Sequence, residues 1–205
     1  MARAAIDRGY EYLAVTDHSH YLRDGRMDAQ AKEIDAVNER LAPFRLLKGV
    51  EVNIKADATL DVSDEDLARR DWVVASIHTS FDRSPTERIC AAMENPHVDC
   101  IGHLTTRKIG RRAGSALDIG RIVAKALETH TAIELNSQPD RLDMPDPIAR
   151  VAGEAGVSVP VTSDAHRIAA LGYVELGIGQ ARRAWLQKKH VLNTRSWAQI
   201  AKIVG

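Results

Sequence analysis

The sequence has few of the features that mark secreted or membrane proteins. It has only two cysteines, Cys90 and Cys100, and their spacing matches neither a disulfide framework nor a paired-cysteine metal site. Residues 1–15 carry two arginines and two acids and lack an uninterrupted apolar run. We therefore expect neither a signal peptide nor a membrane-spanning helix, and we predict a cytoplasmic protein.

The sequence also has no excess of charge of either sign and few aromatic residues. Lys+Arg and Asp+Glu are equal at 28 each, so no overall field attracts nucleic acid or an anionic membrane. Any recognition of phosphate must therefore be local. Aromatic residues make up 4% of the chain, and Trp72, Trp185 and Trp197 fall within apolar patterns that favour core packing over base stacking.

The pattern of apolar residues predicts one α/β domain spanning residues 1–205. Short runs rich in apolar and β-branched residues alternate with amphipathic stretches, which is typical of parallel strands joined by helices, in either a barrel or an open doubly wound sheet. The predicted strands are residues 11–16, 44–52, 71–77, 97–102, 131–136 and 157–163. The predicted helices include residues 27–41, 64–70, 117–128, 146–156, 181–189 and 197–204.

Residues of the metal-binding type stand at the end of five of these strands. The carboxyl ends of parallel strands in a barrel meet on one face, so the side chains are expected to surround one pocket. Nitrogen and oxygen ligands without thiolate favour Zn, Mn or Fe, and neighbouring metals of this kind promote hydrolysis of phosphoesters. The residues are Asp17, His18, Glu51, His78, His103, Asp164 and His166.

Each of these residues also has a purely structural interpretation. A single histidine or aspartate at a strand end is more often a helix cap, a turn residue or a hydrogen-bonded core group. Five strand ends together are harder to explain in this way, because buried imidazoles and carboxylates are costly without partners. We therefore favour a metal site, and His20 is close enough to His18 in the chain to support it.

At these positions the sequence resembles the PHP (polymerase and histidinol phosphatase) family. The matching segments AVTDHS, KGVEVNI, VVASIH, DCIGH and VTSDAH follow in the family's order and spacing over essentially the whole chain. GHLTTRKIGRRAG and IELNSQPDRLDMPD resemble in particular the PHP domain of bacterial family X DNA polymerases and related stand-alone proteins. The resemblance implies a distorted seven-stranded (β/α) barrel that binds up to three metals.

The resemblance also implies roles for individual residues. Glu51 would bridge two metals and share one of them with His78 and His103, whereas His18 would pair with His166 and Asp164 would hold a third metal. Glu51 and Asp164 would be catalytic. The family's first strand, which ends in His-x-His, has no counterpart here, so we expect that strand to be missing, fewer than three metals to bind, and self-association through the open edge.

The implied activity is metal-dependent phosphoester hydrolysis on DNA ends or abasic sites, as in a 3'-5' exonuclease or phosphatase module. Arg107, Arg111 and Arg112 are candidates to bind the substrate phosphates, and a solvated charged loop is the alternative interpretation. Two other functions remain open. One is a small-molecule phosphatase of the histidinol-phosphate type, and the other is a catalytically impaired PHP remnant with a binding role.

Overall fold

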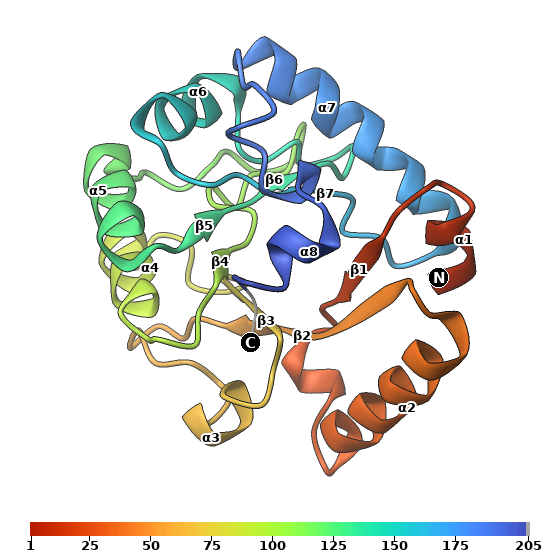
Figure 1. Ribbon diagram of the computed structural model, residues 1–205. Coiled ribbons are helices and arrows are strands. Elements are labelled where there is room, and N and C mark those ends of the chain that lie inside the picture. Colours follow the sequence, from red (N-terminus) through yellow and green to blue (C-terminus); the bar gives the residue numbers. More distant parts are fainter. Residues whose placement is uncertain (204–205) are drawn as a thin grey trace.

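The protein has an α/β fold with helices arranged around a central set of parallel strands (Figure 1). A computed structural model describes residues 1–203. The strands are β1 (Tyr12–Val15), β2 (Arg45–Asn53), β3 (Trp72–Ser76), β4 (Cys100–Ile101), β5 (Ala132–Ile133), β6 (Leu135–Asn136) and β7 (Val161–Thr162). The α-helices are α1 (Ala2–Ile6), α2 (Arg26–Leu41), α3 (Asp64–Leu67), α4 (Pro85–Met93), α5 (Ile119–Thr129), α6 (Asp146–Ala155), α7 (Val174–Arg183) and α8 (Trp197–Ile200). Three short 3-10 helices complete the fold: η1 (Ser19–Tyr21), η2 (Ile168–Tyr173) and η3 (Leu192–Thr194).

The strands pair in parallel and in chain order. β1 to β5 form one sheet, and β6 pairs with β7. β5 and β6 are successive segments of one predicted strand, and the Glu134 amide donates to the Ile101 carbonyl while the Leu135 amide donates to the Pro160 carbonyl. That stretch therefore links the two sheets. All six predicted strands and the α/β class are confirmed, and in residues 1–203 no strand ladder joins β7 to β1.

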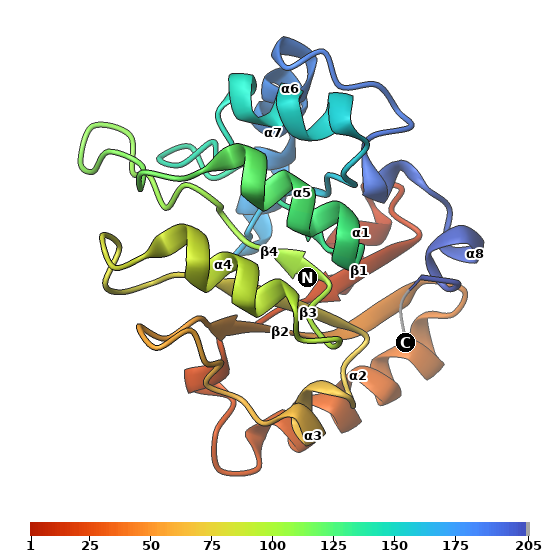
Figure 2. The ribbon, with the colours of Figure 1, turned by 90° about the vertical axis from the view of Figure 1, so that its left-hand side faces the viewer.

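The carboxyl-terminal segment covers the end of the strands at which they begin. Leu192 and Ile200 pack against Cys100 and Ala132, which lie near the starts of β4 and β5. The Tyr12 hydroxyl, at the start of β1, donates to the Arg195 carbonyl at 3.0 Å. Figure 2 shows α8 at one end of the strands and the loop that follows β4 at the other. The carboxyl ends of the strands are thus left for the functional site.

The edge of the sheet next to β7 is partly covered by the same segment. The Val161 amide donates to the Asn193 side chain at 3.0 Å, and the Asn193 amide group donates back to the Val161 carbonyl at 2.8 Å. β1 is the other outer strand and pairs with β2 alone among the described strands. Self-association through an open edge stays a prediction, with β1 as the edge concerned.

Two sequence-based expectations near the carboxyl terminus were wrong. The helix expected over residues 181–189 is α7, which begins at Val174 and ends at Arg183. The glycines in α7 obscured its helical pattern in the sequence. Gly177 is needed because a Cβ there would clash with the Ser137 hydroxyl. Trp185 lies beyond the end of this helix, so it is 72% exposed and not in the core. α8 ends at Ile200, and residue 204 of the predicted helix lies outside the described residues.

No helix among the described residues is both long enough and apolar enough to cross a membrane.

Candidate metal centre

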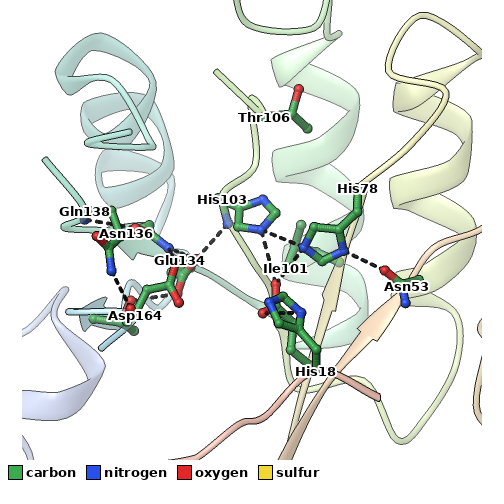
Figure 3. Close-up of polar contacts among 12 residues, drawn as sticks. His18, Asn53, His78, Ile101, His103, Thr106, Glu134, Asn136, Gln138 and Asp164 are labelled. Carbon is green, nitrogen blue, oxygen red and sulfur yellow. Dashed lines mark hydrogen bonds and ion pairs between the residues drawn. The ribbon is translucent and has the colours of Figure 1, made fainter. Parts of the chain in front are cut away.

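Glu51 lies at the centre of a cluster of imidazoles at the carboxyl ends of β1 to β4. It is part of β2, whereas His18, His78 and His103 follow β1, β3 and β4. Neighbouring parallel strands end at the same edge of the sheet, so these four side chains converge. Figure 3 shows the rings of His18, His78 and His103 close together. A short parallel bridge between His18 and Glu51 extends the pairing of β1 with β2 into the site.

The two oxygens of Glu51 face different histidines. Oε1 is 3.1 Å from His103 Nε2 and 3.3 Å from His78 Nε2, and these two nitrogens are 3.2 Å apart. Oε2 is 3.2 Å from His18 Nδ1. Ligands held at about 2.0–2.1 Å from a tetrahedral zinc lie roughly 3.3 Å from one another. The donor atoms therefore fit a divalent metal, and His18, Glu51 and His78 place their ligand atoms within 4.8 Å of one another.

The charge of Glu51 suits a cation. Burial alone would raise the pKa of this carboxyl, but hydrogen bonds from His103 and His78 hold it well below its usual range. Burial lowers the pKa of His18, in part offset by the charge of Glu51. An ionised carboxylate beside a neutral imidazole is the state in which both groups bind metal.

Polar neighbours fix the orientation of His78. Its Nδ1 lies 2.6 Å from Asn53 Oδ1 (Figure 3), and its Nε2 lies 3.3 Å from Glu51 Oε1. The Asn53 side-chain amide donates to Asp61 at 2.6 Å, and the Ser19 hydroxyl donates to the same oxygen of Asp61 at 2.7 Å. Asp61 thus connects the turn that follows His18 with the ring of His78. Partners of this kind fix the tautomer of a histidine that binds metal.

We expect Asn53→Leu to weaken metal binding by about 10- to 100-fold, the usual effect of removing a partner of a metal-binding histidine. The Nδ1 of His78 would lose its hydrogen-bond partner, so the tautomer with Nε2 free for metal would no longer be favoured. Calorimetric titration with zinc measures the change. Asn95→Leu, at a partly buried amide that bonds to Asp64 and to the His97 amide away from the site, is the control that should leave the affinity unchanged. Equal affinities in all three proteins would contradict this role for Asn53.

A second polar cluster lies beside the first, at the ends of β6 and β7. Glu134 accepts hydrogen bonds from the His103 amide at 2.7 Å and from the Thr162 hydroxyl at 2.6 Å. The Asn136 side chain donates to Asp164 at 3.0 Å (Figure 3). Burial raises the pKa of Glu134 to about 7, opposed in part by the nearby His103. This cluster holds Asp164 on the far side of Glu134 from the imidazoles.

Two of the residues at the site have a left-handed backbone. The φ angle is 26° at His103 and 47° at Asp164, a conformation that costs non-glycine residues about 1–3 kcal/mol. The hydrogen bond from the His103 amide to Glu134 and the one from the Gln138 side chain to the Asp164 carbonyl hold these turns. Such strain is common at functional sites, where the surrounding contacts dictate the conformation.

The six predicted ligands lie together at this end of the protein, whereas Asp17, the other strand-end residue expected at the pocket, is exposed and accepts a hydrogen bond from the Gln30 side chain at 2.5 Å. His166 is mostly exposed, its Nδ1 lies 2.9 Å from the Asp164 carbonyl oxygen, and its ring centroid is 6.0 Å from that of His18. A cavity of about 640 Å³ opens beside them. It is lined by His18, Glu51, His103, Lys108, Gln138, Pro139, Asp140, Arg141, Asp164, His166, Arg167, Ala170 and Tyr173.

The structure places the predicted phosphate-binding arginines elsewhere. Arg107 donates to the carbonyls of Arg141 and Leu142, and Arg112 donates to the Thr106 carbonyl, so these guanidiniums brace the loop. Arg111 is exposed. None of the three lines the cavity.

Three other basic residues line the cavity, namely Lys108, Arg141 and Arg167. Lys108 is paired with Asp140 at 2.7 Å. Within residues 1–203, the guanidinium of Arg141 forms no ion pair, although it is half-buried. Arg167 forms no ion pair there either, but it donates to the Tyr173 hydroxyl at 3.3 Å, so Arg141 is the cavity cation with the most free donors for an anion.

The sequence interpretation missed Asn53, Glu134 and Asn136. A usable signal was present, because alternate residues of a strand share a face. Asn53 stands two residues after Glu51, and Asn136 two residues after Glu134, each pair at the carboxyl end of its strand. Polar residues in that alternation at a predicted active face indicate supporting groups. For Arg141 the sequence offers no comparable signal, since it lies in an irregular loop.

Comparisons with known proteins agree with the fold. No family model matches the chain. It is 46% identical over 205 residues to the DNA polymerase/3'-5' exonuclease PolX of Bacillus subtilis, which covers 96% of this chain and 36% of that protein. It is 30% identical over 209 residues to a probable phosphatase of Thermoanaerobacter sp. (strain X514), which covers 94% of this chain and 82% of the relative.

A solved structure shares the fold. Histidinol phosphate phosphatase from Lactococcus lactis, solved with zinc, L-histidinol and phosphate, superimposes with a TM-score of 0.62 at 14% identity, covering 90% of this chain and 86% of that one. The fold and the cluster define an α/β protein with a candidate metal centre at the carboxyl ends of its strands. Together with the relatives, they show that the chain belongs to the PHP family. It spans about a third of the length of the Bacillus polymerase it matches.

Proposed function

We propose that residues 1–205 form a single metal-dependent phosphoesterase domain. The observation that carries the proposal is the arrangement of Glu51, with three imidazole nitrogens at 3.1–3.3 Å from its two oxygens, beside a cavity that contains free cationic side chains. The probable phosphatases and the PolX exonuclease among the relatives support hydrolysis of a phosphoester.

The residues divide into two groups of metal ligands. Glu51, His78 and His103 would hold one metal through Oε1 of Glu51, while His18 would use the other oxygen of Glu51, with His166 and Asp164 nearby. Zn, Mn or Fe in these positions would activate water and neutralise charge on the phosphate. Glu51 remains ionised because its hydrogen bonds outweigh its burial, so it supplies the negative charge that the cations need.

Other side chains would place the substrate. Arg141 can bind the non-bridging phosphate oxygens from the cavity wall, because its guanidinium is a planar donor that suits phosphate. Asp164 is held through one oxygen by Asn136, and its other oxygen lies 3.6 Å from His166 Nδ1, where the two side chains would hold a metal beside that phosphate. These contacts would align a phosphoester with the histidine cluster.

DNA ends or abasic sites are the proposed substrates. The high identity to PolX over nearly the whole chain supports this choice, and so do the two arginines of the cavity lining, Arg141 and Arg167. A small-molecule phosphatase is the second candidate. It is supported by the match to the probable phosphatase of Thermoanaerobacter, of which this chain covers 82% of the length. The two differ in the size of the group that must fit beside the phosphate.

Hydrolysis assays on both substrate classes test the proposal. The chain is stripped of metal, reloaded separately with Zn, Mn or Fe, and mixed with single-stranded oligonucleotides, an abasic oligonucleotide, histidinol phosphate or p-nitrophenyl phosphate. We expect turnover of the oligonucleotides with at least one metal and none after chelation. Turnover confined to the small phosphates would favour the second candidate. No hydrolysis with any metal would overturn the proposed activity and leave a PHP domain with a binding role.

A further inference from the structure

Two exposed aromatic side chains continue the metal centre outward. Tyr21 and His20, both in η1, have ring centroids 4.0 Å apart, and we call them the His20–Tyr21 platform. His20 stacks on His18 with centroids 5.3 Å apart, and Tyr21 lies 6.3 Å from His18. An aromatic surface therefore begins at a candidate metal ligand and ends at a ring that is 61% exposed.

The fold does not require an exposed aromatic ring at Tyr21. The turn is anchored by its neighbours, since Ser19 is buried and donates to Asp61, and Leu22 is buried in the main core. In residues 1–203 the other strongly exposed aromatic side chain is Trp185, and that ring lies under the guanidinium of Arg150 at 4.9 Å. A protein with few aromatic residues thus exposes one of them at its functional site.

We propose that the His20–Tyr21 platform is a nucleobase subsite that stacks an unpaired base of a nucleic acid strand next to the phosphate to be cleaved. The proposal rests on the proposed phosphoesterase function and names the substrate class of that site. Every base presents a π-face to an aromatic ring, so such stacking tolerates any sequence. A base within a duplex has both faces covered by its neighbours, so the platform would select single-stranded or frayed ends.

The rest of the cavity complements a strand of this kind. Arg141 and Arg167 supply positive charge in the cavity lining and Tyr173 supplies an aromatic side chain there, whereas His20 and Tyr21 lie outside that lining. The metal ligand His18 lies between the two parts, because it lines the cavity and also contacts His20. A nucleic acid strand bound here would place its phosphates beside these cations and one of its bases on the aromatic platform. A phosphate ester without a base would use the cations alone.

The test compares two substrates that differ only in their bases. Oligothymidine and an abasic oligonucleotide of the same length and backbone are hydrolysed by the wild-type protein, Tyr21→Ala and Tyr21→Trp, each loaded with the same metal. Loss of one base stack by alanine substitution corresponds to a decrease of about 5- to 150-fold. We expect that decrease in kcat/KM for Tyr21→Ala on oligothymidine, no change on the abasic strand, and rescue by Tyr21→Trp. Trp185→Ala, at an exposed aromatic that lies against Arg150 and not against His18, should change neither rate.

A binding measurement keeps this inference separate from the catalytic proposal. Oligothymidine should quench the fluorescence of the tryptophan introduced by Tyr21→Trp, whereas the abasic strand should not. Equal loss on both substrates, no loss with Tyr21→Ala, or equal quenching by both strands would overturn the base subsite. If the wild type hydrolyses neither substrate, the phosphoesterase proposal fails, and the quenching alone decides whether the platform binds bases.

Discussion

Glu51→Gln is expected to lower both metal occupancy and phosphoester hydrolysis by more than about 100-fold, since loss of a residue that merely supports a ligand already costs 10- to 100-fold. The amide has the shape of the carboxylate but lacks its charge, and three imidazoles converge on its two oxygens. Each facing histidine would therefore lose the same anionic partner. Metal analysis of the purified variant and a hydrolysis assay at saturating metal measure the two effects.

Glu154→Gln is the matched control for this variant. Glu154 is exposed and forms a surface ion pair with Arg150, a contact that contributes at most about 1 kcal/mol. The same chemical change there should leave metal content and turnover at the wild-type level. Comparable losses in the two variants would mean that the effect at Glu51 comes from general destabilisation, and our assignment of the cluster would fail.

Arg141→Met is expected to reduce kcat by about 100-fold or more, the usual effect of removing a preorganised donor that stabilises charge in the transition state. Methionine keeps much of the apolar stem and removes the guanidinium from the cavity. The metal ligands stay in place, so metal content should not change, and this separates the variant from Glu51→Gln. Steady-state kinetics with metal analysis on the same sample measure both quantities.

Arg111→Met is the control for this second variant. Arg111 was a sequence-based candidate for phosphate binding, but it is exposed and does not line the cavity. We expect little change in kcat for the Arg111 variant. A larger loss at Arg111 than at Arg141 would restore the basic loop to the mechanism and contradict the role we assign to the cavity arginine.

The ligands could be predicted from the sequence because topology alone brings them together. Parallel strands that alternate with helices end on one face, so His18, Glu51, His78 and His103 needed only the correct assignment of strands to be placed in one cluster. Their contacts follow from the backbone. Asn53 is predictable by the same logic, since it shares a strand face with Glu51.

The basic residues could not be predicted in the same way, because long side chains in irregular loops are directed by tertiary contacts. Arg107 and Arg112 stand in the most basic segment, yet carbonyl groups of their own loop and of a distant one take up their donors. Arg141 stands in a less basic segment but reaches the cavity. Local sequence does not specify which guanidinium meets a free carbonyl. Similarly, Gly177 of α7 reflects close packing against Ser137, which no helical propensity encodes.

Metal titration of the stripped wild-type protein, side by side with Glu51→Gln, tests the central claim most directly. We predict saturable binding of zinc or manganese by the wild type, and a rise in melting temperature of about 5–10 °C at a metal concentration about 100 times the Kd. Glu51→Gln should show neither effect. Absence of saturable binding by the wild type, or equal binding and equal stabilisation in the variant, would contradict a metal centre built around Glu51.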